Sequence, residues 1–372
     1  MKRNLLLIIL LLLVSPLNIY SENLEPINSY TERAIVLEVE NRQETAEVEG
    51  MPEKFQYVKL KVISGKNKGD IFETENHLSD NIAYDIVVEK GDKVVIVIDE
   101  YKDGYLETYI ADYARQNHIF YLLGLFILLI ILIGNKKGIK AVITLGFTIF
   151  MILKVLLPLM LKGIDPIFIS VSMSIAITMV TIFVIGGINS KSIAAIIGTS
   201  SGVLIAGIIA YIVGSQVRLT GLSGEEATML MYIPQGIDFD FRSLLFSGII
   251  LGALGAIMDV GMSISSSIEE IYNANQSLTT RELFNAGMNV GKDIMGTMTN
   301  TLILAYTGSS IPLLLLFMAY ETSMIKIINL DIIATEIVRS LSGSIGLVLT
   351  IPLTALIASI LTKREEGYTI GK

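Results

Sequence analysis

The stretch "LLFSGIILGALGAIMDVGMSISSSIEEI", residues 244–271, decides the class of fold. Its apolar run starts at Leu244 and carries one carboxylate, Asp259, behind which come four serines and two glutamates. About 20 apolar residues are enough to cross the hydrocarbon core of a bilayer. The stretch therefore predicts a membrane helix with an acid set into it, which raises the question of what the acid does there.

The composition of the whole chain agrees with a membrane protein. Of the 372 residues, 52% are hydrophobic and only 17% are charged, whereas about a quarter of the residues of a soluble domain are charged. Cysteine is absent and His77 and His118 are the only histidines, which excludes disulfides, thiolate catalysis and Cys- or His-rich metal sites. A carboxylate-only Mg²⁺ or Ca²⁺ site stays open, but no EF-hand spacing occurs and we expect no cofactor and no metal. The net charge of −8, without a long basic run, favours no nucleic-acid partner.

Further apolar runs of similar length follow residue 118. Lipid offers the backbone no hydrogen-bond partner, so these runs must be helical. We expect an α-helical polytopic membrane bundle of about seven transmembrane helices in residues 118–362, with a cytoplasmic tail at 363–372. The predicted spans are residues 119–133, 141–161, 167–188, 193–213, 244–263, 301–320 and 344–361.

The region before the bundle has a different pattern. Residues 1–21 combine Lys2 and Arg3 with a short apolar run, as in a signal peptide or an uncleaved signal anchor. Residues 22–117 contain stretches that alternate between apolar and polar residues, such as 58–62 and 94–98, bounded by glycine turns. This alternation predicts a small antiparallel β-rich domain outside the cytoplasm.

The basic residues of the loops predict the orientation. With the β domain outside, eight basic residues lie on the cytoplasmic side and five on the outer side, as the positive-inside rule favours. We therefore expect a multi-pass protein of the cytoplasmic membrane, with its C-terminus in the cytoplasm. The inner residues are Lys136, Lys137, Lys140, Lys191, Arg281, Lys292, Lys363 and Arg364, and the outer ones Lys162, Arg218, Arg242, Lys326 and Arg339.

Two polar stripes mark the candidate site. On a helix, Ser263, Ser266 and Glu270 share one face with Asp259. After the loop, Asn289, Asp293 and Asn300 lie on one face of the next helix, together with Asn285 and Gly296. The two helices are expected to be antiparallel neighbours, which would place Asp259 and Asp293 at similar depth with one stripe able to face the other.

Three interpretations of these stripes stay open. They could hold the helices together, with Lys292 and Arg281 available as partners; such polar contacts contribute about 0.6–2 kcal/mol each. They could line a permeation or coupling site, because a carboxylate in a partly dehydrated site takes up a proton readily. They could belong to an intramembrane aspartyl protease, but Asp293 stands in "VGKDIMG" and lacks the glycine-bracketed signature. We expect no enzyme.

Two blocks of this region resemble one bacterial family. "LGALGAIMDVGMSISSSIEEI" and "LFNAGMNVGKDIMGTMTNTLILAYTGSS" look like the central blocks of the YibE/F family of multi-pass membrane proteins. The earlier stretch "GIKAVITLGFTIFMILKVLLPLMLKGIDPI" is similar to the first helical hairpin of that family. The resemblance implies a membrane location and a multi-span fold, but it supplies no reaction and no site residues.

We therefore predict a transporter, permease or export-related protein with a polar intramembrane site, driven by protons in one version of the hypothesis. The alternative is a non-transporting scaffold or regulator whose β domain binds an envelope partner. Expected partners are membrane lipids and an unidentified small molecule or ion, and the sequence also allows a homo-oligomer. Glu336 and Arg339, three residues apart before the last run, are expected to form an ordinary surface ion pair.

Overall fold

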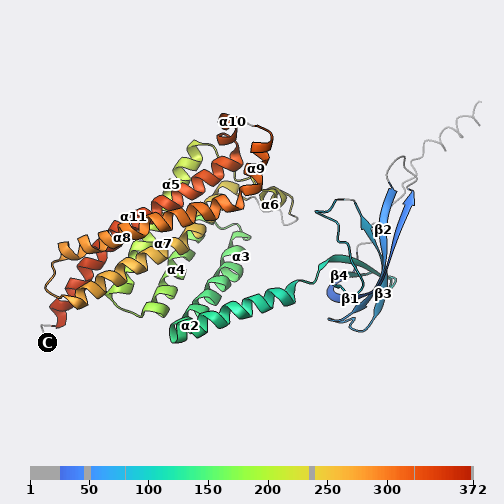
Figure 1. The fold of residues 1–372 in the computed structure, drawn as a ribbon, viewed down its shortest axis with the longest axis horizontal. Coiled ribbons are helices and arrows are strands. Elements are labelled where there is room, and N and C mark those ends of the chain that lie inside the picture. Colours follow the sequence, from blue (N-terminus) through green and yellow to red (C-terminus); the bar gives the residue numbers. More distant parts are fainter. Residues whose placement is uncertain (1–25, 46–51, 80, 234–238, 322, 370–372) are drawn as a thin grey trace, which may run out of the picture. The chain divides into compact units, whose positions relative to one another are not determined.

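The chain divides into two compact units in the computed structural model, which describes residues 26–45, 52–79, 81–233, 239–321 and 323–369. The first unit ends at Leu125 and the second begins at Phe126. Figure 1 labels the strands and helices of the chain. The predicted signal segment, residues 1–21, lies outside the described residues.

The first unit is a five-stranded antiparallel sheet curved into a half-barrel, as the alternating pattern predicted. Its strand order is β3-β2-β1-β4-β5, and the Thr74 hydroxyl on β3 donates to the Thr108 carbonyl on β5. The strands are β1 (Asn28–Thr45), β2 (Pro52–Val62), β3 (Ile71–Leu78), β4 (Lys93–Glu100) and β5 (Leu106–Tyr113).

Alternation along the strands builds the core of this unit. Val58 and Leu60 of β2 and Ile96 and Ile98 of β4 are all buried on the inner face. Buried Gln56 fixes the loop between β3 and β4, because it accepts a hydrogen bond from the Val88 amide at 2.9 Å and donates one to the Val88 carbonyl at 3.1 Å. The backbone amide and carbonyl of buried Val88 are both paired in this way.

The second unit is helical, as predicted. Within the described residues, five of its helices are long and apolar enough to cross a membrane, or six when the bent pair α8 and α9 counts as one span. The longer elements are α2 (Gln116–Phe150), α4 (Pro166–Gly186), α5 (Ser190–Gln216), α7 (Phe241–Ala274), α8 (Thr280–Ser309) and α11 (Asp331–Thr369). The shorter ones are η1 (Met151–Leu156), α3 (Leu157–Met160), α6 (Glu225–Met229), η2 (Leu230–Tyr232), α9 (Ile311–Ala319) and α10 (Met324–Ile328).

The first two of the seven predicted runs lie on one bent helical segment, Gln116–Met160. A break divides this segment at Asn135, whose backbone has φ 48° and ψ −127°. Gly138, after the break, is pressed against the backbone of Ile130, before it. Residues 119–133 and 141–161 therefore lie on either side of a sharp bend, with no loop between them.

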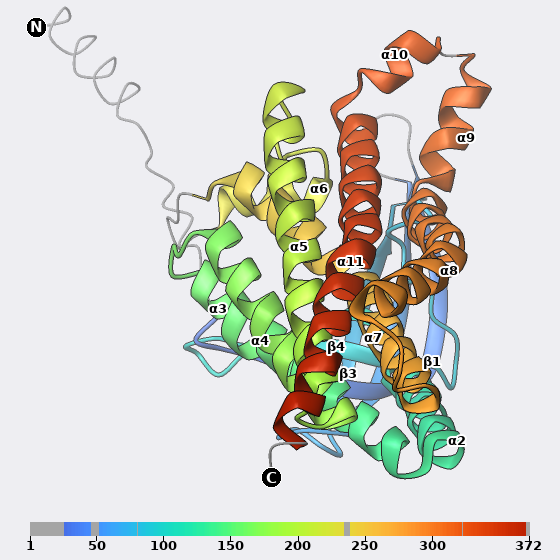
Figure 2. The ribbon, with the colours of Figure 1, turned by 90° about the vertical axis from the view of Figure 1, so that its left-hand side faces the viewer.

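A second break divides the sixth predicted run. α8 ends at Ser309 and α9 starts at Ile311, bent away by 61°. Pro312, which has no backbone N–H to continue the helical ladder, stands in the first turn of α9. Figure 2 shows that α9 and α10 form an arch that leads from α8 to the start of α11.

The bundle is packed around α7 and the contact of α5 with α11. α7 contributes Ile250, Ile257 and Ile264 to the main hydrophobic core. Helices α5 and α11 run side by side (Figures 1 and 2) and approach closely where Gly202 faces Gly346. A β-carbon at Gly202 would lie 2.9 Å from the Gly346 carbonyl oxygen, and one at Gly346 would lie 2.6 Å from the Gly202 carbonyl oxygen. Small residues of this kind let membrane helices approach closely.

We predict that Gly202→Ala destabilises the bundle by about 1–3 kcal/mol, because the new methyl group would force α5 and α11 apart. Gly146→Ala on α2 is the matched control, since a β-carbon there has no atom within 4 Å. Alanine is favoured over glycine in a helix by about 0.5–1 kcal/mol, so the control should be neutral or stabilising. Thermal unfolding in detergent micelles measures both variants, and equal effects would contradict the packing described here.

Candidate functional site

The α7 stripe lies on the outer surface of the bundle. Asp259, Ser263 and Glu270 are exposed and Ser266 is half-buried. The opposite face of α7 is apolar and buried. One face of α7 therefore packs into the bundle, and Asp259 lies on the opposite, exposed face.

The α8 stripe is also on the surface. Asn289, Asp293 and Asn300 are exposed, whereas Gly287 and Gly291 of the same helix are buried. Gly287 packs against Ile268 and Gly291 against Ile264 of α7, which sets the antiparallel register of the two helices. By this register Asp259 and Asp293 lie within roughly one helical turn of the same level. The α7–α8 contact is made by small and apolar residues and not by the two stripes.

Neither aspartate has a partner within the described residues. No hydrogen bond and no ion pair joins the side chain of Asp259 or Asp293 to any other described group. Lys292 and Arg281, the partners considered above, form no ion pair with them among these residues. The stripes therefore do not hold α7 and α8 together within one chain. An unpaired charge facing lipid would cost roughly 2.5–3.5 kcal/mol at a helix centre.

A second polar cluster joins α8 to α11, and the sequence analysis missed it. Arg339 Nη1 donates to Glu336 Oε1 at 2.7 Å, and the Arg339 guanidinium lies 6.0 Å from the centre of the Tyr306 ring. The two charged side chains are only 29% and 22% exposed. The expected ion pair therefore forms, but it is more enclosed than an ordinary surface pair, because the Tyr306 ring of α8 lies beside it.

Three atoms of this cluster are buried without a hydrogen-bond partner: Tyr306 Oη, Glu336 Oε2 and Arg339 Nε. Groups of this kind normally find a protein or water partner, and leaving one unmade costs about 1–3 kcal/mol. The only local signal of this cluster in the sequence was a tyrosine within an apolar run. The spacing of Glu336 and Arg339 predicted that they pair, but not which residue lies beside the pair.

Helix α4 carries a third polar feature, a row of hydroxyls. Ser170, Ser174, Thr178 and Thr181 recur along one side of the helix, and their hydroxyls are buried without a hydrogen-bond partner. By contrast, Ser172 on the same helix donates to the Phe168 carbonyl at 2.9 Å, the usual arrangement. The row adds to the buried serines and threonines that α5, α7 and α11 also carry.

An ion pair also fixes the C-terminal half of α7. Lys191 Nζ, in the first turn of α5, lies 2.5 Å from Glu269 Oε2 on α7. Both side chains are partly buried, at 20% and 29% exposure. This pair holds the start of α5 against α7 one residue before Glu270 of the predicted stripe.

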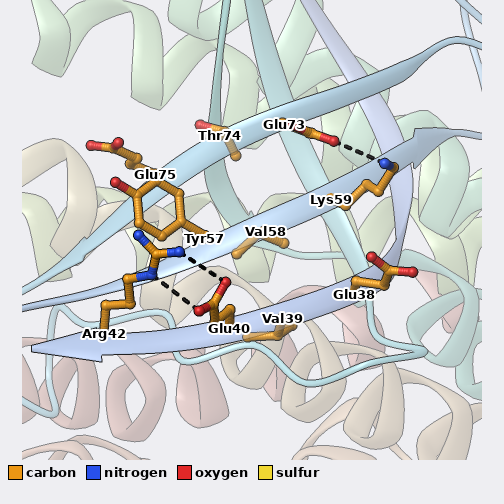
Figure 3. Close-up of a pocket in the computed structure, with 10 residues that line it drawn as sticks. All are labelled: Glu38, Val39, Glu40, Arg42, Tyr57, Val58, Lys59, Glu73, Thr74 and Glu75. Atoms are coloured by element: carbon orange, nitrogen blue, oxygen red, sulfur yellow. Dashed lines mark hydrogen bonds and ion pairs between the residues drawn. The ribbon is translucent and has the colours of Figure 1, made fainter.

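The β unit has a polar groove of its own. A cavity of about 680 Å³ lies on the outer face of β1, β2 and β3, where Lys59 Nζ pairs with Glu73 Oε1 at 2.8 Å (Figure 3). Arg42 pairs with Glu40 at 3.1 Å beside the Tyr57 ring. The hydrogen bond and charge of Lys59 lower the pKa of Glu73, and the same contact raises the pKa of Lys59. Four glutamates against one lysine and one arginine leave the groove acidic.

Metal binding has no support in the described part of the chain, where no group of three or more His, Cys, Asp or Glu side chains is arranged to hold an ion.

Two family models match the sequence. The one described as "YibE/F-like protein" matches residues 122–364, and the one described as "YibE/F family N-terminal domain" matches residues 28–113. No curated protein and no solved structure matches.

The Glu336–Arg339 pair generates a prediction about stability. Glu336→Leu alone should destabilise the bundle more than Glu336→Leu combined with Arg339→Met, because the single change leaves a positive charge unpaired. The cost of breaking such a pair is about 3–5 kcal/mol in a fully buried site and less here, where about a quarter of each side chain is exposed. Thermal unfolding of the two variants in detergent measures the order, and a less stable double variant would show that the pair itself is stabilising.

Proposed function

The chain belongs to the YibE/F family of membrane proteins, as its central blocks predicted, and from this premise we propose that it moves a small molecule or ion across the membrane. The observation that carries the proposal is the pair of unpartnered carboxylates, Asp259 and Asp293, on the outward faces of α7 and α8. Lipid is a poor environment for these groups, and the chain itself supplies no partner among its described residues. Water is the environment that satisfies both stripes.

A hydrated path along α7 and α8 has support from the rest of the bundle. The α8 stripe runs from Asn289 to Asn300, and Tyr306 of the Tyr306–Glu336–Arg339 cluster lies further along the same helix. Tyr306 packs beside Gly252, two turns before Asp259 on α7. Polar groups therefore occur at two levels along the α7–α8 pair. In this proposal the aspartates bind and release the transported cation or a coupling proton, as the sequence hypothesis suggested.

The rival function is that of a scaffold or regulator. The observation that favours it is the acidic groove of the β unit, which is large enough to receive side chains of a basic partner. In that case the membrane bundle would serve as an anchor, and the polar stripes would be contact surfaces for another chain.

The absence of native cysteine allows a direct test of hydration. We expect Asp259→Cys, Ser263→Cys, Asp293→Cys and Asn300→Cys to react with a membrane-impermeant thiol reagent that requires water, in inside-out vesicles. Leu349→Cys is the control, because Leu349 is 38% exposed on α11, within the last apolar run and outside both stripes, and should stay unlabelled. Ser277→Cys, in the loop between α7 and α8, is the positive control. Silence at all four stripe positions would contradict a hydrated path.

A paired genetic test separates transport from scaffolding. A deletion strain loses a transport-linked phenotype, which the unchanged protein restores. We expect the variant with both Asp259→Asn and Asp293→Asn not to restore it, because neither side chain can then exchange a proton or hold a cation. Glu225→Gln in α6 is the control and should leave the phenotype unchanged. A protein without residues 22–117 should still restore part of the phenotype. If that protein restores nothing while the asparagine variants are fully active, the scaffold function is favoured instead.

A further inference from the structure

The outward faces of α7 and α8 carry no large apolar side chain over most of their length. From Phe241 to Ile303, no such side chain is exposed among the described residues. Other long helices of the bundle differ, since α5 exposes Leu204 and Ile208 and α11 exposes Leu341 and Leu349. Polar residues of membrane helices face other helices or water and not lipid. The α7–α8 face therefore does not have the composition of a surface that meets lipid.

Glycines occupy part of this face. Gly248 and Gly255 of α7 and Gly296 of α8 are exposed, and a β-carbon at each would have no neighbour within 4 Å outside its own helix. Gly255 lies one turn before Asp259 on the same side of α7, and by the α7–α8 register Gly296 lies level with Asp259. Small residues in membrane helices mark places where another helix packs closely. No described helix of this chain packs against these three glycines.

The charged groups of the same face have both signs and no partner in the chain. Asp259, Asp293 and Glu270 are exposed, as are Lys292 and Arg281. No ion pair joins any of them to another described residue. A purely basic or purely acidic partner would place like charges together somewhere on this face. A copy of the same chain avoids this, because a face with both signs can pair with itself across a two-fold axis.

We propose that a second copy of this chain covers the α7–α8 face. Two copies have the same orientation in a membrane, so a two-fold axis along the membrane normal brings equal levels of the two faces together. Gly248 and Gly255 then allow close helix contact. Lys292 of one copy lies about one helical turn from the level of Asp259 of the other, by the α7–α8 register.

The second copy also gives the hydrated path its outer wall. That consequence rests on the proposed function, whereas the contact between the copies does not. A silent result in the cysteine-labelling experiment contradicts the hydrated path only, so the two proposals fail on different measurements.

Energy transfer between copies measures the association. Ser277→Cys, in the loop between α7 and α8, gives a chain with one cysteine, which is labelled with an equal mixture of donor and acceptor dyes. The protein is placed in phosphatidylcholine liposomes at increasing dilution with lipid. We expect energy transfer that persists at dilutions where chance encounters no longer contribute. Transfer that falls to the level of chance encounters would overturn the proposal.

Gly255→Leu, added to the labelled protein, locates the contact. We expect it to weaken the association about 10-fold, the effect of roughly 1.4 kcal/mol of overpacking. Gly146→Leu on α2 is the matched control, because that glycine is also exposed and open. Both variants should keep the circular-dichroism spectrum of the unchanged protein, since leucine has room within the chain at both positions. Equal association of the two variants would place the contact elsewhere and overturn the proposal.

Charge reversal tests the pairing of the two faces. Donor-labelled Lys292→Glu protein and acceptor-labelled Asp259→Lys protein are mixed in detergent before reconstitution. We expect more energy transfer in this mixture than in samples of either variant labelled with both dyes, because only the mixed pair brings opposite charges together at both contacts. Equal transfer in all three samples would overturn the assigned two-fold arrangement.

Discussion

The helical unit depends on the close contact of α5 with α11. Helices in lipid gain little from the hydrophobic effect when they associate, so their packing relies on short distances between backbones. Gly202 and Gly346 allow that approach, and Ile257 of α7 lies against the same point. α7 is therefore held in a fixed rotation, with its isoleucines inward and Asp259 outward. The position of the candidate site is a consequence of glycine packing on the neighbouring helices α5 and α11.

Local patterns in the sequence predicted much of the fold. The β strands followed from alternation between glycine turns, and the membrane helices followed from the length of apolar runs. Both signals depend on neighbouring residues only. The bend at Asn135 and the break before Pro312 were not predicted, because a helix can bend or stop without a change in hydropathy. The first joins two predicted runs in one bent segment, and the second divides one predicted run into two helices. Pro312 gave a recognisable signal, whereas the positive φ of Asn135 depends on how the two halves of α2 pack.

The site was less predictable than the fold. The spacing placed Asp259 and Asp293 on continuous faces and at similar levels, and the α7–α8 register agrees with that. It could not show which way those faces turn, because the rotation of a helix is set by all of its neighbours. The partly buried position of Glu336 and Arg339 could not be predicted from local pattern for the same reason, because Tyr306, which lies beside them, is at least 30 positions earlier in the chain. A polar residue in a membrane helix can therefore be recognised from sequence, but its partner cannot.

Buried hydroxyls without a hydrogen-bond partner occur on several helices of the bundle. Hydroxyls that serve only packing normally donate to the carbonyl one turn earlier, as Thr350 does to Gly346 at 2.8 Å. The α4 row and the Tyr306 cluster do not follow this rule, and each buried group without a partner costs free energy. Such groups are retained when something outside the chain satisfies them, either water or a bound molecule. The exposed carboxylates on α7 and α8 have no partner among the described residues either, so the helix contacts of this bundle leave several of its polar groups unsatisfied.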